Sequence, residues 1–156
     1  QVTELRVSGS YLKQIPQGIL NATQLIFLDL SNNNISELPP EMCCLTTLAE
    51  LNLADNDLIE IPEDIIRQLT QLKKLDLSSN KRLKKIPIPA LLNLKQLKEL
   101  TLYSTSLLLT DKEVKDLKQA IEFVAYQQQQ RAHFNFLASG NIVCHVGMGS
   151  LIGVSC

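Results

Sequence analysis

The chain has 156 residues, of which 45% are hydrophobic and 4% aromatic, and it contains no tryptophan; this is the size and composition of one ordinary globular unit. Its formal net charge of −1 gives no overall electrostatic reason to expect a nucleic acid or an anionic membrane as partner. No apolar run approaches the length of about 18 residues that indicates a transmembrane helix.

One pattern of apolar residues occurs five times between residues 2 and 110. In the segment LIFLDLSNNNI, apolar residues occupy positions one, four, six and eleven, and an asparagine occupies position nine. The alternation at positions four to six predicts a short strand with one buried face. Strands that begin at the same point of each unit predict a parallel sheet. The copies begin at Val2, Leu25, Leu48, Leu72 and Leu97, with successive spacings of 23, 23, 24 and 25.

This pattern resembles the leucine-rich repeat family, whose signature L-x-x-L-x-L-x-x-N-x-L recurs every ~20–29 residues. The resemblance implies an α/β fold: a right-handed leucine-rich-repeat solenoid with a parallel concave β-sheet, short helical or 3-10 turns on the convex side and a C-terminal capping helix. We expect three parts, namely a repeat array at 1–110, a helical cap at 111–138 and a tail of unassigned structure at 139–156.

A proline follows an apolar residue at one fixed position of four repeats. Proline fixes φ and makes its predecessor extended, so we expect each pair to begin the return path from the sheet. The variant is similar to the L-P-x-x-I type of cytosolic scaffold proteins in the family, and helical spacing predicts one or two turns at 63–69 and 89–94. The pairs are Ile15-Pro16, Leu38-Pro39, Ile61-Pro62 and Ile86-Pro87.

Position nine of the repeats forms a column of polar residues where the chain leaves the strand. An asparagine side chain both donates and accepts, so a stacked row of them can bond the turn backbone of its own repeat and of the next. The resemblance implies the same structural role. The end members are hydroxyl residues and indicate looser outer repeats. The column is Ser10, Asn33, Asn56, Asn80 and Thr105.

The repeat pattern stops after Leu107, where a different signal begins. The residues from Thr110 to Glu113 form a capping-box sequence in front of a predicted helix. Val114, Leu117, Ile121 and Val124 then recur at helical spacing and predict one apolar face. We expect a helix from 111 to about 130 that covers the last repeat; the alternative is an amphipathic helix that uses the same face to bind a partner.

The outward-facing strand positions form three columns on the predicted concave surface. Phe27 and Tyr103 differ from the polar residues around them, and exposed aromatics on a rigid sheet are typical of binding hot spots. Asp29, Asp76, Ser31 and Ser78 are equally compatible with solubility. The candidate partner-binding residues are Arg6, Phe27, Asp29, Glu50, Asn52, Lys74, Asp76, Glu99, Thr101 and Tyr103.

Two clusters of opposite charge lie in neighbouring repeats. They suggest either mutual neutralisation along a solvated ridge or a patch for an acidic partner segment. The basic cluster is Lys73, Lys74, Lys81, Arg82, Lys84 and Lys85, and the acidic cluster is Asp55, Asp57, Glu60, Glu63 and Asp64.

The cysteines and histidines do not show the spacing of a metal or nucleophile site. Cys43 and Cys44 are adjacent, His133 and His145 lie far from them, and no C-x-x-C or H-x-x-x-H motif occurs. Four such cysteines do not match the disulfide caps of extracellular family members, which favours a reducing compartment. Against this stand two glycosylation triplets at 21–23 and 34–36, which matter only in a secreted chain. We expect no metal, no cofactor and no catalytic residue.

These features predict a cytoplasmic protein–protein interaction module that binds an unidentified partner protein through the concave face. No small-molecule substrate is expected. The chain is expected to be a monomer, although its uncapped first strand leaves edge pairing open. One alternative is a secreted pathogen effector that enters a host cytoplasm and mimics host scaffolds of this family. Another is a regulatory or substrate-targeting domain of a larger signalling enzyme.

Overall fold

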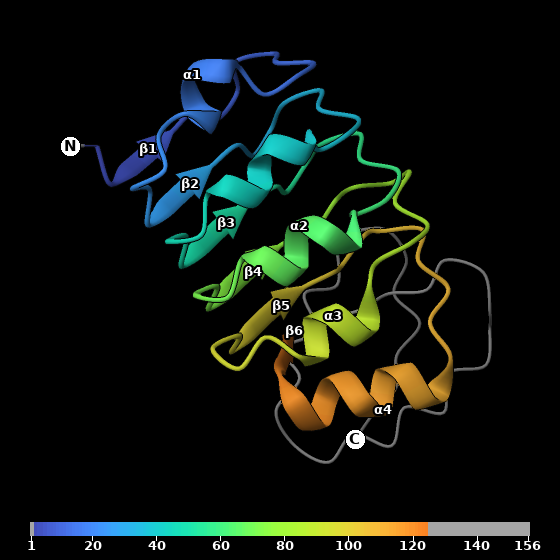
Figure 1. The fold of residues 1–156 in the computed structure, drawn as a ribbon. Helices are drawn as coiled ribbons and strands as arrows, with labels where there is room; N and C mark the ends of the chain where they lie inside the picture. Colours follow the sequence, from blue (N-terminus) through green and yellow to red (C-terminus); the bar gives the residue numbers. More distant parts are fainter. Residues whose placement is uncertain (1, 125–156) are drawn as a thin grey trace.

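Six short strands form one parallel sheet in the computed structural model, which describes residues 2–124 (Figure 1). Their order in the sheet is their order in the chain. Five of them are the predicted strands, and the sixth was not predicted. The strands are β1 (Glu4–Arg6), β2 (Phe27–Asp29), β3 (Glu50–Asn52), β4 (Lys74–Asp76), β5 (Glu99–Thr101) and β6 (Glu122–Val124).

The strand register follows from the repeat period. The first five strands turn their middle residues inward, and the pairing aligns these residues across the sheet as Leu5, Leu28, Leu51, Leu75 and Leu100. From Leu28 onward these leucines are at most 2% exposed. Burying one leucine contributes about 1.5–3 kcal/mol, so the stack of neighbouring repeats, and not any single repeat, stabilises the sheet.

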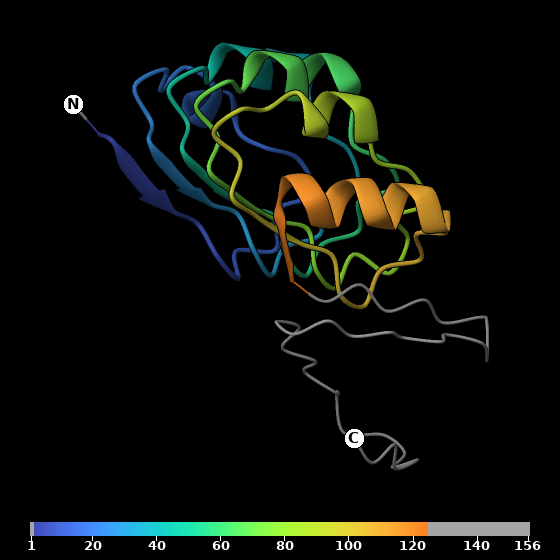
Figure 2. The ribbon, with the colours of Figure 1, turned by 90° about the horizontal axis from the view of Figure 1, so that it is seen from below.

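Short helices carry the chain back on the other side of the sheet (Figure 2). Each is preceded by the proline of the apolar-proline pair, which is the residue before the first turn in all four. The predicted helical turns at 63–69 and 89–94 are confirmed, with small shifts at their ends. The elements are α1 (Gln17–Leu20), the 3-10 helix η1 (Pro40–Cys44), α2 (Glu63–Gln68) and α3 (Ile88–Leu92).

The asparagine column forms a continuous hydrogen-bonded ladder. Asn56 Nδ2 donates to the carbonyls of Leu30 and Leu53, at 2.9 and 3.2 Å, while its Oδ1 accepts from the Ile35 amide. The Leu30 carbonyl also accepts from Asn33, and the Leu53 carbonyl also accepts from Asn80. Two asparagines of adjacent repeats therefore share each carbonyl.

The direction of this ladder corrects the prediction. Each asparagine bonds its own repeat and the preceding one, not the next: Asn33 reaches back to the Val7 carbonyl and to the amides of Ser10 and Leu12. The first repeat has no described repeat before it, so Ser10 has no such bonds to make and is exposed. Thr105 is buried, and its hydroxyl donates to the Leu102 carbonyl of its own repeat.

A second column, at position eight, was not predicted. Its residues all have a left-handed backbone, with φ between 54° and 67°. Glycine adopts this conformation freely, and asparagine and aspartate tolerate it best among the other residues. The sequence signal was therefore present as a small or polar residue at position eight of every repeat. These residues are Gly9, Asn32, Asp55, Ser79 and Ser104.

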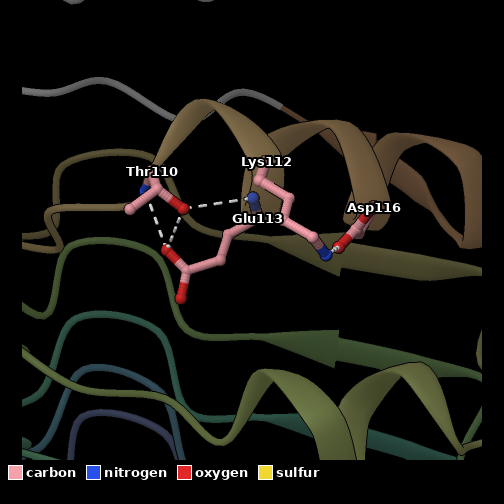
Figure 3. Close-up of polar contacts among 4 residues, drawn as sticks. All are labelled: Thr110, Lys112, Glu113 and Asp116. Atoms are coloured by element: carbon pink, nitrogen blue, oxygen red, sulfur yellow. Dashed lines mark hydrogen bonds and ion pairs between the residues drawn. The ribbon is translucent and has the colours of Figure 1, made fainter.

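The predicted C-terminal helix exists but is shorter than expected. Helix α4 (Asp111–Ala120) begins at the predicted capping box, where the Glu113 amide donates to Thr110 Oγ1 and the Glu113 carboxylate accepts from the Thr110 amide (Figure 3). Leu117 is buried and Val114 packs against the core, so this face covers the last repeat.

The prediction that the helix continues to about residue 130 is wrong. The chain leaves the helix at Ile121 and enters β6, which pairs with β5. Phe123 aligns with Leu100, one repeat period earlier, so the repeat resumes and places a sixth strand on the sheet. Val124 belongs to this strand, not to the helix. The predictions for 125–138 and for the tail at 139–156 lie outside the described residues.

Replacing Asn56 by alanine should lower the free energy of unfolding by about 2 kcal/mol or more, because buried backbone groups lose their hydrogen-bond partners. These groups are the Ile35 amide, which loses its acceptor, and two carbonyls, which lose a donor. Urea denaturation measures the change.

The matched control for this variant is Asn34→Ala, at an exposed asparagine of the preceding repeat. A surface substitution of this kind should change stability by less than about 0.5 kcal/mol. Equal stability of the two variants would contradict the ladder's role.

Replacing Thr110 by alanine should cost about 1 kcal/mol, because helix N-caps without a side-chain acceptor are less stable. The lost group is the hydroxyl that accepts from the Glu113 amide. Thr110→Ser keeps that hydroxyl and should remain close to the parent. Thermal denaturation of the three proteins compares them directly. A Thr110→Ala protein as stable as Thr110→Ser would show that the capping box contributes nothing to the fold.

Candidate protein-binding surface

The face of the sheet opposite the helices carries nine of the ten predicted binding residues in two rows that cross the strands; the tenth, Tyr103, lies beyond the end of β5. The strand pairing aligns Glu4, Phe27, Glu50, Lys74 and Glu99 in the first row. It aligns Arg6, Asp29, Asn52, Asp76 and Thr101 in the second. Every one of these five strands therefore contributes one side chain to each row.

The first row contains an aromatic residue that contacts an arginine of the neighbouring strand. The Arg6 guanidinium carbon lies 4.5 Å from the centroid of the Phe27 ring, a cation–π distance. Arg6 also lies 3.7 Å from the Glu4 carboxylate on the same strand. Phe27 is half-buried. The ring therefore already packs on the sheet face, and its remaining surface is open to a partner.

The middle of the first row is an ion pair between neighbouring strands. Lys74 Nζ lies 3.8 Å from Glu50 Oε1, and both side chains are about half exposed. An exposed pair of this kind contributes little to stability. Its charges are accessible to a partner, and together with Glu4 and Glu99 they make the first row mainly acidic with one lysine.

The second row has a structural role that the sequence did not reveal. Asp29 Oδ1 accepts from the Ser31 amide at 2.9 Å, and Asn52 and Asp76 do the same with the amides two positions further on. Such turns fix the chain as it leaves a strand. These three side chains, predicted as binding residues, are therefore engaged by their own repeats, although they remain half-buried and in reach of a partner.

One predicted binding residue is inaccessible. Thr101 is only 7% exposed. It lies on β5, which pairs with the unpredicted strand β6, and Val124 is its register partner. Ser78, in the third column, is also buried, and its hydroxyl donates to Asp76 Oδ1 at 2.6 Å.

Comparison with known proteins decides the family. A family model described as leucine-rich repeat region matches residues 3–128, which is most of the chain. The chain belongs to the leucine-rich repeat family. Domains of this family are generally protein-interaction scaffolds and are typically not catalytic.

Solved structures of leucine-rich repeat proteins are similar to this chain. One is a leucine-rich repeat protein of Leptospira interrogans, with 29% identity over 78% of this chain and 36% of that one, at a TM-score of 0.56. Another is the plant peptide hormone receptor RGFR1 in complex with RGF2, with 34% identity over 71% of this chain and 18% of that one, at a TM-score of 0.57. The chain thus spans about a third or less of their lengths. Among curated proteins the comparison finds no significant match.

One exposed apolar residue of this repeat surface escaped the sequence analysis. Ile26, immediately before β2, is an exposed apolar residue, with 49% of its surface accessible. The equivalent positions of the other repeats hold Thr3, Ala49, Lys73 and Lys98, so an isoleucine among them was the available signal. Tyr103 is half-buried beyond the end of β5, and three strand spacings, about 14 Å, separate its strand from that of Phe27.

The repeat geometry divides both charged clusters. Lys73 and Lys74 lie at the start of β4, whereas the other basic residues follow the turn after it. Glu63 pairs with Arg67 within α2. Within residues 2–124, no ion pair joins the acidic cluster to the basic one, so direct neutralisation, one of the two interpretations of these clusters, does not occur by contact.

Among the described residues, no group of three or more histidines, cysteines or carboxylates could hold a metal ion. The Cys43 and Cys44 sulfurs are 4.0 Å apart. Partial burial, and then the contact with the Cys44 thiol, raise the pKa of Cys43, which lowers its thiolate fraction at neutral pH. None of the helices in this part of the chain is long and apolar enough to cross a membrane.

Replacing Asp76 by alanine should lower the free energy of unfolding by about 1 kcal/mol, since hydrogen-bond donors at the end of β4 lose their acceptor. These donors are the Ser78 amide and hydroxyl. Asp76→Asn retains an oxygen at this position and should be clearly more stable than the alanine variant. Chemical denaturation distinguishes the two. If asparagine is as damaging as alanine, the charge matters and the turn bond does not.

Proposed function

We propose that this chain is a protein-interaction module that binds a partner protein through the sheet face, with Phe27 as the central contact. The observation that carries the proposal is the Phe27 ring, which is half-buried on the sheet and lies 4.5 Å from the Arg6 guanidinium carbon. An aromatic that already packs on its own sheet loses less freedom when a partner covers it. The similarity to a peptide hormone receptor in complex with RGF2 favours a peptide or protein as the partner class.

The same surface would serve both alternatives, because a secreted effector and a targeting domain of a signalling enzyme also act by holding a partner protein. We place the chain in the cytoplasm, or in a host cytoplasm if it is delivered there, since Cys43 and Cys44 are free thiols and free thiols are typical of reducing compartments. We expect a monomer: the edge strand β1 is short and carries Glu4 and Arg6, and short charged edges resist pairing.

Replacing Phe27 by alanine should weaken partner binding by about 1 kcal/mol or more, which is about fivefold, and Tyr103→Ala should act in the same direction. The matched control is Tyr11→Ala, which removes an aromatic that is 86% exposed but lies outside the strand rows. Affinity capture from a cell lysate identifies proteins that bind the parent and Tyr11→Ala but not Phe27→Ala/Tyr103→Ala. Each such protein is purified, and its affinity for every variant is measured by titration. Equal affinity of all variants would refute the proposal.

A second measurement locates the contact without removing any aromatic. A photo-reactive amino acid at Glu50, in the first row, should crosslink the purified partner, whereas the same probe at the exposed Lys95 should not. Crosslinking from Lys95 alone would place the partner away from the sheet face.

A further inference from the structure

We propose that a basic patch on the fourth repeat is a second interaction surface and binds an acidic segment of a protein. This patch, which we call the flank patch, lies after the turn that follows β4 and is distinct from the sheet face. The proposal goes beyond the sheet-face function and does not depend on it. The flank patch consists of Lys81, Arg82, Lys84 and Lys85.

All four side chains of the flank patch are exposed, and none pairs with a carboxylate of the described residues. The chain advances four residues from Lys81 to Lys85 and spans at most about 14 Å, which is less than twice the Debye length of about 8 Å at physiological salt. The four charges therefore act together on an approaching ligand, and none of them is held in an ion pair within residues 2–124.

The backbone of the flank patch is fixed before any ligand arrives. Leu83, in its centre, is fully buried, and its amide donates to the Asn80 carbonyl at 3.0 Å. The Lys84 amide donates to the Ile59 carbonyl, and the Lys85 carbonyl accepts from the Ile61 amide. A ligand therefore orders only the outer parts of four side chains, which lowers the cost of binding.

An insertion creates part of this charge. One residue separates the ladder asparagine from the next buried apolar residue in the second and third repeats, as in Asn56-Asp57-Leu58, but two separate Asn80 from Leu83. The ladder bonds of Asn80 and the burial of Leu83 are unaffected. The fold thus does not need the extra residue between Asn80 and Leu83. A departure from the repeat pattern that the fold does not require points to function.

The neighbouring repeat restricts the class of partner. Asp55, Asp57 and Glu60 lie on the preceding coil, and Glu60 is the β-bridge partner of Lys85, so the two flanks are about 5 Å apart. A flat anionic membrane or a long nucleic acid would meet this acidic flank as well as the basic one. A short acidic peptide segment that runs along the fourth repeat avoids it.

The test uses a fluorescent peptide of alternating Asp and Ser, about 12 residues long so that it spans the patch. Anisotropy measures its binding to the parent chain at low and high salt. The patch variant Lys81→Gln/Arg82→Gln/Lys84→Gln/Lys85→Gln should bind at least about tenfold more weakly and with less salt dependence. The charge-matched control Lys13→Gln/Lys95→Gln/Lys98→Gln/Lys115→Gln, made at four other exposed lysines, should bind like the parent.

Several results would overturn the proposal. These are no binding by the parent at low salt, equal weakening in the two quadruple variants, equal or tighter binding of single-stranded DNA or phosphatidylserine vesicles, or parent self-association that the patch variant lacks. Circular dichroism confirms that each variant is folded. Phe27→Ala/Tyr103→Ala should retain peptide binding, so the flank patch and the sheet face can fail independently.

Discussion

Carbonyl oxygens shared by asparagines of adjacent repeats hold this structure in register. The Leu30 carbonyl accepts from Asn33 and Asn56, and the Leu53 carbonyl accepts from Asn56 and Asn80. Polar groups this deeply buried are costly unless they are bonded. The turn after each strand must therefore align with the turn of the neighbouring repeat. This alignment also sets the register of the core leucines and of the two rows of the sheet face.

Much of the fold could be predicted because the spacing of the leucines in the sequence determines the register of the strands. Leu28, Leu51 and Leu75 are equivalent in sequence and are direct partners across the sheet. The end of α4 could not be read in this way. Ile121 and Val124 fit helical spacing, but Phe123 also lies one repeat period after Leu100. The local sequence therefore fits both a longer helix and a new repeat strand. The structure forms the strand, which pairs with β5.

The candidate site was less predictable than the fold, because exposure depends on neighbours that the sequence does not name. Phe27 and Asp29 are both outward positions of β2, yet Asp29 closes a turn and Phe27 lies against Arg6 from another repeat. Thr101 occupies an outward position of the pattern and is nevertheless buried. Asp29, Asn52 and Asp76 of the second row are better understood as part of the scaffold, and the proposed recognition therefore rests mainly on the first row.

The two proposed surfaces use the repeat architecture in different ways. The sheet face gathers one side chain from each repeat, so its composition depends on the register of the whole stack. The flank patch belongs to one repeat. Because each repeat contacts only its neighbours, the insertion before Leu83 changes the charge of a single coil while the ladder beneath it stays intact. A stack of this kind can therefore acquire a local contact without altering the surface that crosses it.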